Sequence, residues 1–191
     1  VITAGDRVAL RQAGENSEMA GVLLSISGPS GVGKTTICKL LVQRLNAHLS
    51  VSVTTRARRE NEVDGRDYFF ISREEFKRRL ERNDLLEHAE VYGGNCYGTP
   101  AGPVKDALAT NRVVILEIEI EGTLQVKRRF PELLGIYIMP PTAADLRDRL
   151  YGRRTDSDEA IRERLSKADG EIRYAHECGA YGHFLINADL E

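Results

Sequence analysis

Residues 28–35 read Gly28-Pro29-Ser30-Gly31-Val32-Gly33-Lys34-Thr35 and match the pattern G-x-x-x-x-G-K-[ST] at every position. An apolar run at residues 22–27 predicts a buried strand before this loop, and Ile37, Leu40 and Leu41 recur at helical spacing after it. In that setting the glycines let successive backbone N–H groups point at phosphate oxygens, at the positive end of the helix. The alternative is a glycine-rich turn that merely joins strand to helix. The full match in its full context favours a nucleotide-binding loop.

Two side chains of this loop carry specific expectations. The Lys34 ammonium should reach the β- and γ-phosphates, and the Thr35 hydroxyl should ligate Mg²⁺. The expected nucleotide-binding residues of the loop are Gly28, Pro29, Ser30, Gly31, Val32, Gly33, Lys34, Thr35 and Thr36. Because GTPases, ATPases and kinases all carry such a loop, it predicts a bound nucleotide but not yet a reaction.

Outward from the loop, short apolar runs alternate with helical patterns. Strands are expected at residues 22–27, 51–53, 113–118, 136–139 and 184–186, with helices between them. This alternation predicts an α/β fold with a parallel core sheet. Residues 54–99 break the alternation, with strand patterns at 68–71 and 85–91 and a helix capped by Ser72 and Glu75. They predict a small mixed lobe inserted into the larger fold.

Composition limits the classes of partner. The 191 residues suffice for one compact domain, and 27 Lys and Arg against 29 Asp and Glu give a formal net charge of −2. This balance does not suggest binding to nucleic acid or to an acidic membrane. Three cysteines, Cys38, Cys96 and Cys178, lack metal-site spacing and fit a cytoplasmic protein. The apolar runs are far shorter than the ~20 residues of a membrane span, and no signal pattern follows Val1. The oligomeric state stays open.

The blocks that follow the loop resemble the guanylate kinase family over about residues 23–191. They are residues 52–59 (SVTTRARR), 62–70 (EVDGRDYFF), 86–87 (LE), 97–100 (YGTP), 140–141 (PP) and 187–190 (NADL). The resemblance implies a P-loop three-layer fold with a parallel core sheet, an inserted small mixed β lobe for the acceptor nucleotide and a helical lid. It implies Mg²⁺-dependent, in-line transfer of the γ-phosphoryl group from ATP to GMP, and to dGMP, giving ADP and GDP.

The same resemblance divides the chain. Residues 1–20 are a lead-in to which we assign no chemistry, and residues 21–191 form the guanylate-kinase-like domain. Its core is expected at 21–53 and 100–191, its acceptor-binding lobe at about 54–99 and its lid at about 147–164.

Chemistry and resemblance agree on the acceptor side. Arg56 and Arg59 offer forked donors to a monophosphate, which Tyr68 and Tyr97 can supplement with hydroxyl groups. Guanine presents N1–H and a 2-amino group as adjacent donors, and a carboxylate such as Glu87 accepts from both. The resemblance implies substrate-binding roles for Ser52, Arg56, Arg59, Tyr68, Glu87, Tyr97, Thr99 and Glu119. Taken alone, the arginines read as solvated surface and Tyr68 as a packed strand residue.

On the donor side, the resemblance places three lid arginines on the ATP phosphates and Asn187 near the adenine. The expected catalytic residues are Lys34, Arg56, Arg149, Arg153 and Arg164. Cations delivered by lid closure stabilise the charge that spreads over the transferring phosphoryl group. The chain departs from the family at residues 117, 119 and 121, where glutamates replace aspartates and a glutamine. The side chain of Glu119 is one methylene group longer than that of an aspartate, so its charge is kept but shifted in position.

Two alternatives stand beside the kinase. One is a protein-binding module of the same fold that lacks catalysis, and such modules typically lose the chemistry of the phosphate loop, which this chain keeps. The other is a kinase of the same fold that uses another nucleotide or a sugar phosphate as acceptor. The set Ser52, Glu87 and Thr99 favours guanine.

Overall fold

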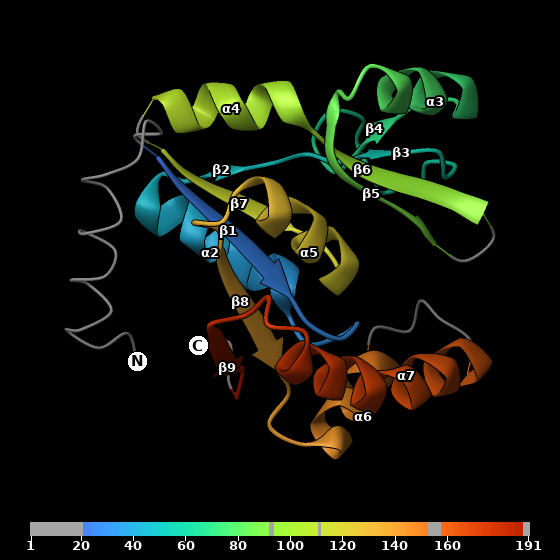
Figure 1. The fold of residues 1–191 in the computed structure, drawn as a ribbon. Helices are drawn as coiled ribbons and strands as arrows, with labels where there is room; N and C mark the ends of the chain where they lie inside the picture. The colour runs from blue at the N-terminus through green and yellow to red at the C-terminus, as the bar shows by residue number, and fades with distance from the viewer. Residues whose placement is uncertain (1–20, 92–93, 111, 153–157, 189–191) are drawn as a thin grey trace.

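Two β-sheets organise the chain, for which the computed structural model describes residues 21–91, 94–110, 112–152 and 158–188. The strands of the larger sheet are β1 (Val22–Ser27), β2 (His48–Leu49), β7 (Val113–Glu117), β8 (Leu134–Met139) and β9 (His183–Ile186). They lie in the order β2-β7-β1-β8-β9 and all pair in parallel. The predicted parallel core sheet is confirmed (Figure 1).

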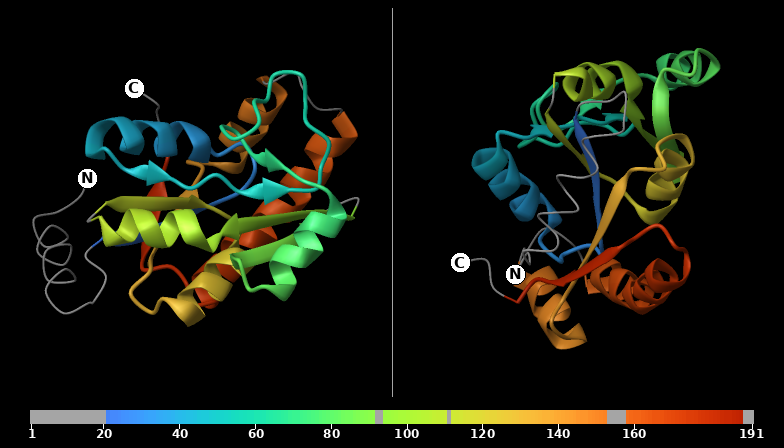
Figure 2. Two further views of the ribbon diagram at one scale, coloured as in Figure 1. Left: turned by 90° about the horizontal axis from the view of Figure 1, so that it is seen from above. Right: turned by 60° about the vertical axis from the view of Figure 1, so that its left-hand side comes forward.

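Helices cover both faces of this core sheet. They are α2 (Lys34–Leu45), α4 (Ala101–Ala109), α5 (Ile120–Arg129), α6 (Ala143–Gly152) and α7 (Asp158–Glu177). Successive residues of β1 point to opposite faces. Leu23 joins the core cluster that includes Val104 and Val126 of α4 and α5, whereas Leu24 joins the cluster that includes Cys38 and Leu146 of α2 and α6. The result is the predicted three-layer arrangement, seen from two further sides in Figure 2.

The smaller sheet is mixed, as predicted. Its strands are β3 (Val53–Thr54), β4 (Phe69–Phe70), β5 (Leu85–Val91) and β6 (Asn95–Pro100), in the order β4-β3-β6-β5. β3 pairs in parallel with β4 and antiparallel with β6, which pairs antiparallel with β5. The predicted helix cap is present, because the Ser72 hydroxyl at the start of α3 (Arg73–Glu81) accepts the Glu75 N–H at 3.1 Å.

One strand prediction is wrong in its placement. Residues 51–53 were expected to continue the core sheet, but β2 is the strand that pairs there and β3 belongs to the smaller sheet. The chain crosses between the sheets within three residues. The Ser50 N–H donates to the Ile115 carbonyl of the core sheet at 2.9 Å, and the Ser52 carbonyl already accepts the Phe69 N–H at 2.9 Å. β2 has only two residues, so the sequence contains no apolar run that would have predicted it.

β6 was not predicted, because its glycine and proline argue against a strand. The structure explains the glycine: a Cβ at Gly98 would lie 2.8 Å from Leu85 Cδ1 and 3.0 Å from the Glu87 carbonyl oxygen.

The lid expected at about residues 147–164 corresponds to the end of α6 and the start of α7, and its residues 153–157 lie outside the described residues, as do residues 1–20. Among the described helices, none is long and apolar enough to cross a bilayer.

Candidate active site

The phosphate loop follows the carboxyl end of β1 and leads directly into α2. Its backbone has positive φ angles at three glycines. Gly28 and Gly31 have φ angles of +151° and +91°, and a Cβ at these positions would lie 2.4 Å from the Ile138 carbonyl oxygen and 2.8 Å from Leu150 Cδ2. Gly33, with φ +98°, is the N-cap of α2. The loop therefore presents backbone and the N-terminus of α2 where the sequence predicts a triphosphate.

Lys34 and Thr35 both make contacts across this loop. The Lys34 ammonium donates to the carbonyls of Gly28 at 2.6 Å and Pro29 at 3.1 Å. The Thr35 hydroxyl donates to Glu117 Oε1 at 2.7 Å, at the end of the neighbouring strand β7. A hydroxyl beside a carboxylate at a phosphate loop is a pair of hard oxygen ligands of the kind that Mg²⁺ prefers.

Glu117 was missed by the sequence reasoning, which selected Glu119 from the same segment. Glu119 is the N-cap of α5. Burial raises the pKa of Glu87 on the acceptor side, and the charge of Glu119 adds to that rise. A signal for Glu117 existed. The strand at 113–117 pairs with β1, and its last residue, Glu117, pairs with Ile26, two residues before the phosphate loop.

A buried thiol lies behind the loop. Burial, reinforced by the nearby charge of Glu117, raises the pKa of Cys38 to about 12. The thiol therefore stays protonated at neutral pH, and since thiolates and not thiols are nucleophiles, Cys38 is a poor nucleophile there.

The carboxyl-terminal half reaches the loop from two helices and a strand. Arg149 of α6 donates to the carbonyls of Asn187 at 2.8 Å and Ala188 at 3.0 Å, and the Asn187 amide donates to the Val32 carbonyl at 2.8 Å. Arg164 of α7 donates to the Ser30 hydroxyl at 3.0 Å. Three of the predicted donor-side residues thus gather at the phosphate loop, while Arg153 lies outside the described residues. Thr36 lies on the exposed first turn of α2.

On the acceptor side, Arg56 is the centre of a cluster. Its Nε donates to the Tyr97 hydroxyl at 3.1 Å, and its carbon Cζ lies 5.6 Å from the centroid of the Tyr68 ring. Its two terminal nitrogens donate to Glu62 at 2.7 and 3.1 Å, which is a bidentate pair. Glu62 also accepts the Arg59 N–H at 2.8 Å.

The pairing of Arg56 with Glu62 shifts the pKa of both groups. The hydrogen bond to Glu62 raises the pKa of Arg56, and the same bond lowers the pKa of Glu62. Burial raises the pKa of Tyr68, so the tyrosine is a hydroxyl donor at neutral pH. Glu62 was not among the predicted site residues. A carboxylate six residues after an arginine in a loop gives no periodic signal, so only the folded loop shows the contact.

The second acceptor-side pair is buried. Glu87 is 6% exposed, and its Oε1 accepts the Thr99 hydroxyl at 2.6 Å. Burial raises the pKa of Glu87, and the hydrogen bond from Thr99 works against that rise. Ser52, the remaining member of the predicted base-reading set, immediately precedes β3 and is partly exposed. The buried Glu87 carboxylate can accept hydrogen bonds from a pair of adjacent N–H donors.

The fold and the site together define a class of protein. A phosphate loop on a three-layer parallel α/β core, facing an inserted lobe with its own arginine cluster, is the arrangement of a P-loop kinase with separate donor and acceptor sites.

The chain belongs to the guanylate kinase family, whose model, described as "Guanylate kinase", matches residues 21–191. A guanylate kinase of Trichodesmium erythraeum is 48% identical over 172 residues, which cover 90% of this chain and 90% of the relative. A guanylate kinase of Halalkalibacterium halodurans is 45% identical over 172 residues, covering 90% and 82%. The crystal structure of a guanylate kinase from Anaplasma phagocytophilum superposes with a TM-score of 0.71 at 37% identity, covering 91% of this chain and 80% of that one.

Proposed function

We propose that this chain catalyses ATP + GMP → ADP + GDP, and uses dGMP as well, by in-line phosphoryl transfer between the two sites described above. The observation that carries the proposal is the buried Glu87–Thr99 pair, which shares one chain with an intact phosphate loop. A protein-binding module would have no need of Lys34 and Thr35 in the loop. A kinase for a base without paired donors would leave the remaining acceptor positions of the buried Glu87 carboxylate without donors from the base.

At the donor site, ATP takes the phosphate loop, and Thr35 with Glu117 would hold the Mg²⁺ that accompanies it. The ion, when bound, supplies positive charge against the β- and γ-phosphates. Lys34 adds an ammonium at the same phosphates, and Arg149, Arg153 and Arg164 add guanidinium groups from the lid. Asn187 contacts the adenine side of the nucleotide.

At the acceptor site, Arg56 and Arg59 bind the phosphate of GMP with the help of the Tyr68 and Tyr97 hydroxyls. The phosphate oxygen itself is the nucleophile, so the chain need only position it and neutralise charge. Glu87 accepts from guanine N1–H and N2–H, and Ser52 and Thr99 contact the O6 edge. Glu119 would add a negative charge on the acceptor side, near the metal when it is bound. We place this reaction in the cytoplasm.

A coupled assay of ADP release tests this proposal on a panel of GMP, dGMP, AMP, CMP, UMP and a sugar phosphate. We expect kcat/KM for GMP to exceed that for AMP by about 10⁴ or more, because adenine lacks the donor pair and turns its N1 lone pair toward the carboxylate. Comparable rates for GMP and AMP would contradict the guanine assignment. Absence of ADP release with every acceptor would favour the protein-binding module.

A further inference from the structure

The strand that carries Glu87 is irregular where the carboxylate sits. In the ladder between β5 and β6, Leu85 pairs with Pro100 and His88 pairs with Gly98, so that Leu86 and Glu87 together stand opposite one residue. Such a bulge frees a residue from the ladder and re-aims its side chain. Here Leu86 turns into the main core cluster while Glu87 turns toward Thr99. The ladder with β6 therefore does not fix the backbone at Glu87.

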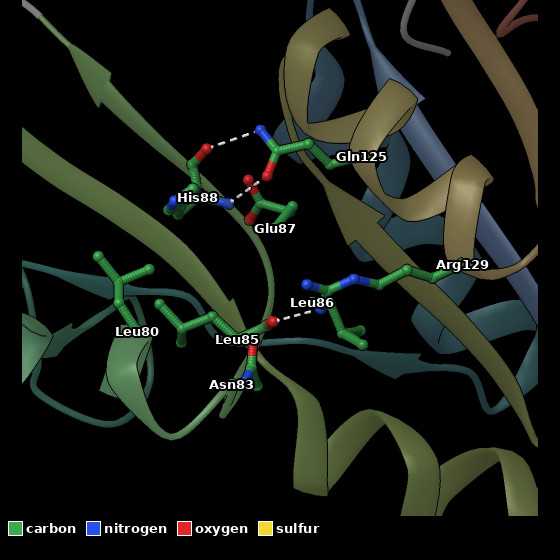
Figure 3. A pocket seen from close by; sticks show the side chains of 8 residues that line it. All are labelled: Leu80, Asn83, Leu85, Leu86, Glu87, His88, Gln125 and Arg129. Atoms are coloured by element: carbon green, nitrogen blue, oxygen red, sulfur yellow. Dashed lines mark hydrogen bonds between the residues drawn. The ribbon is translucent and has the colours of Figure 1, made fainter. Parts of the chain in front are cut away.

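Within the described part of the chain, no strand pairs with the opposite side of β5, which lies at the edge of its sheet. Two side chains of α5 take that place (Figure 3). Gln125 accepts the His88 N–H at 3.0 Å and donates to the His88 carbonyl at 2.8 Å, as a neighbouring strand would. Arg129 donates to the Leu85 carbonyl at 2.7 Å. The backbone is thus held by α5 on both sides of the bulge.

A third residue of α5 contacts Glu87 itself. A Cβ at Gly122 would lie 2.7 Å from Glu87 Oε2, so the glycine leaves room for the carboxylate and limits where it can sit. Gly122, Gln125 and Arg129 are spaced i, i+3 and i+7, which places them on one face of the helix. Gln125 and Arg129 also line a cavity of about 310 Å³ between α5, β5 and the end of α3, so the two side chains bridge an incompletely packed junction (Figure 3).

We propose that Gly122, Gln125 and Arg129 of α5 are positioning residues that set the orientation of the Glu87 carboxylate and so determine the preference for a base with a 2-amino group. The inference rests on the proposed reading of guanine by Glu87. None of the three residues needs to touch the nucleotide. They act by fixing the bulge through which Glu87 is presented.

Selectivity between GMP and IMP tests this role, because IMP lacks only the 2-amino group. We expect Gln125→Ala to raise the KM for GMP about five- to tenfold, which corresponds to the loss of one or two ordinary hydrogen bonds. The GMP-to-IMP ratio of kcat/KM should narrow, while the KM for ATP stays within about twofold. Arg129→Ala should act in the same direction, and Arg129→Lys, which keeps a donor for the Leu85 carbonyl, should largely restore both values. Arg128→Ala, at an exposed neighbour on the same helix, is the matched control.

Two more variants separate the possible failures. Gly122→Ala adds one methyl group against the Glu87 carboxylate and should narrow the GMP-to-IMP ratio of kcat/KM. This variant tests the role of α5 if Gln125→Ala fails to fold. Glu87→Gln tests the base reading directly. If Glu87→Gln narrows the ratio but Gln125→Ala and Gly122→Ala change only the thermal midpoint, α5 is merely structural and this inference is wrong. If Glu87→Gln leaves the ratio unchanged, Glu87 does not read the base, and both proposals fail together.

Discussion

The donor and acceptor sites of this molecule are built in opposite ways. The donor loop is one contiguous stretch, residues 28–36, whose glycines and helix N-terminus present backbone groups. The acceptor residues are scattered from Ser52 to Glu119, and several meet through side-chain contacts such as Arg56–Tyr97 and Glu87–Thr99. A site made of backbone is specified locally, whereas a site made of side chains depends on how distant segments pack. Single substitutions should therefore have different effects on the two sites.

The largest effect is expected at the donor loop. Lys34→Ala should lower kcat by about 10³ or more, because the variant loses the ammonium that stabilises charge on the transferring phosphoryl group. The fold should stay intact, although the variant also loses the hydrogen bonds from Lys34 to the carbonyls of Gly28 and Pro29. Steady-state kinetics and circular dichroism measure the two properties. Lys39→Ala, an exposed lysine of the same helix, is the control, and near-normal turnover in Lys34→Ala would refute the donor assignment.

A smaller and more selective effect is expected at Arg56. Removing a charge-assisted contact costs about 1.5–3 kcal/mol, so Arg56→Ala should raise the KM for GMP by about 10- to 100-fold. The KM for ATP should hardly change, since Arg56 contacts Tyr97, Glu62 and Ala57 of its own lobe. Arg66→Ala is the control, because it removes an arginine of the same lobe whose side chain is 66% exposed and pairs with Asp67. An equal rise in both KM values would place Arg56 on the wrong ligand.

The smallest expected effect is a pH dependence of base selectivity. Burial raises the pKa of Glu87, so this carboxyl group gains its proton at a higher pH than an ordinary glutamate does. The protonated form donates where it should accept, so the GMP-to-IMP ratio should fall severalfold as the pH drops from 7.5 through that raised pKa. GMP and IMP carry the same phosphate group, so its titration affects both substrates equally and cancels in the ratio. Thr99 and Glu119 are the neighbours that tune this group, and Glu87→Gln should show a flat ratio.

The sequence predicted the donor half better than the acceptor half, for the same physical reason. A phosphate loop is a local motif, and the alternation around it determines the parallel sheet. Glu117 was missed because its role depends on β7 lying beside β1. Glu62 was missed because its contact with Arg56 exists only in the folded loop.

The acceptor lobe also depends on features without sequence periodicity. β6 carries a glycine and a proline that usually exclude strands, and the β5 bulge follows no pattern of alternation. Glu87, Tyr97 and the acceptor arginines were selected through resemblance to a family, whose ordered blocks supply the long-range information that local propensity lacks. Gln125 and Arg129 read as ordinary polar residues of a surface helix.

The pairing of β2 with β7 has a consequence for how the chain folds. His48 lies beside Val114 and Leu49 beside Ile115, although the whole smaller sheet and α4 lie between them in the chain. Closing a flexible loop of that size costs entropy that grows with the logarithm of its length. A lobe that has already folded shortens the flexible part and brings its own ends together. We therefore expect the lobe to fold before β2 pairs with β7, so that a folded unit and not a flexible loop connects the two strands.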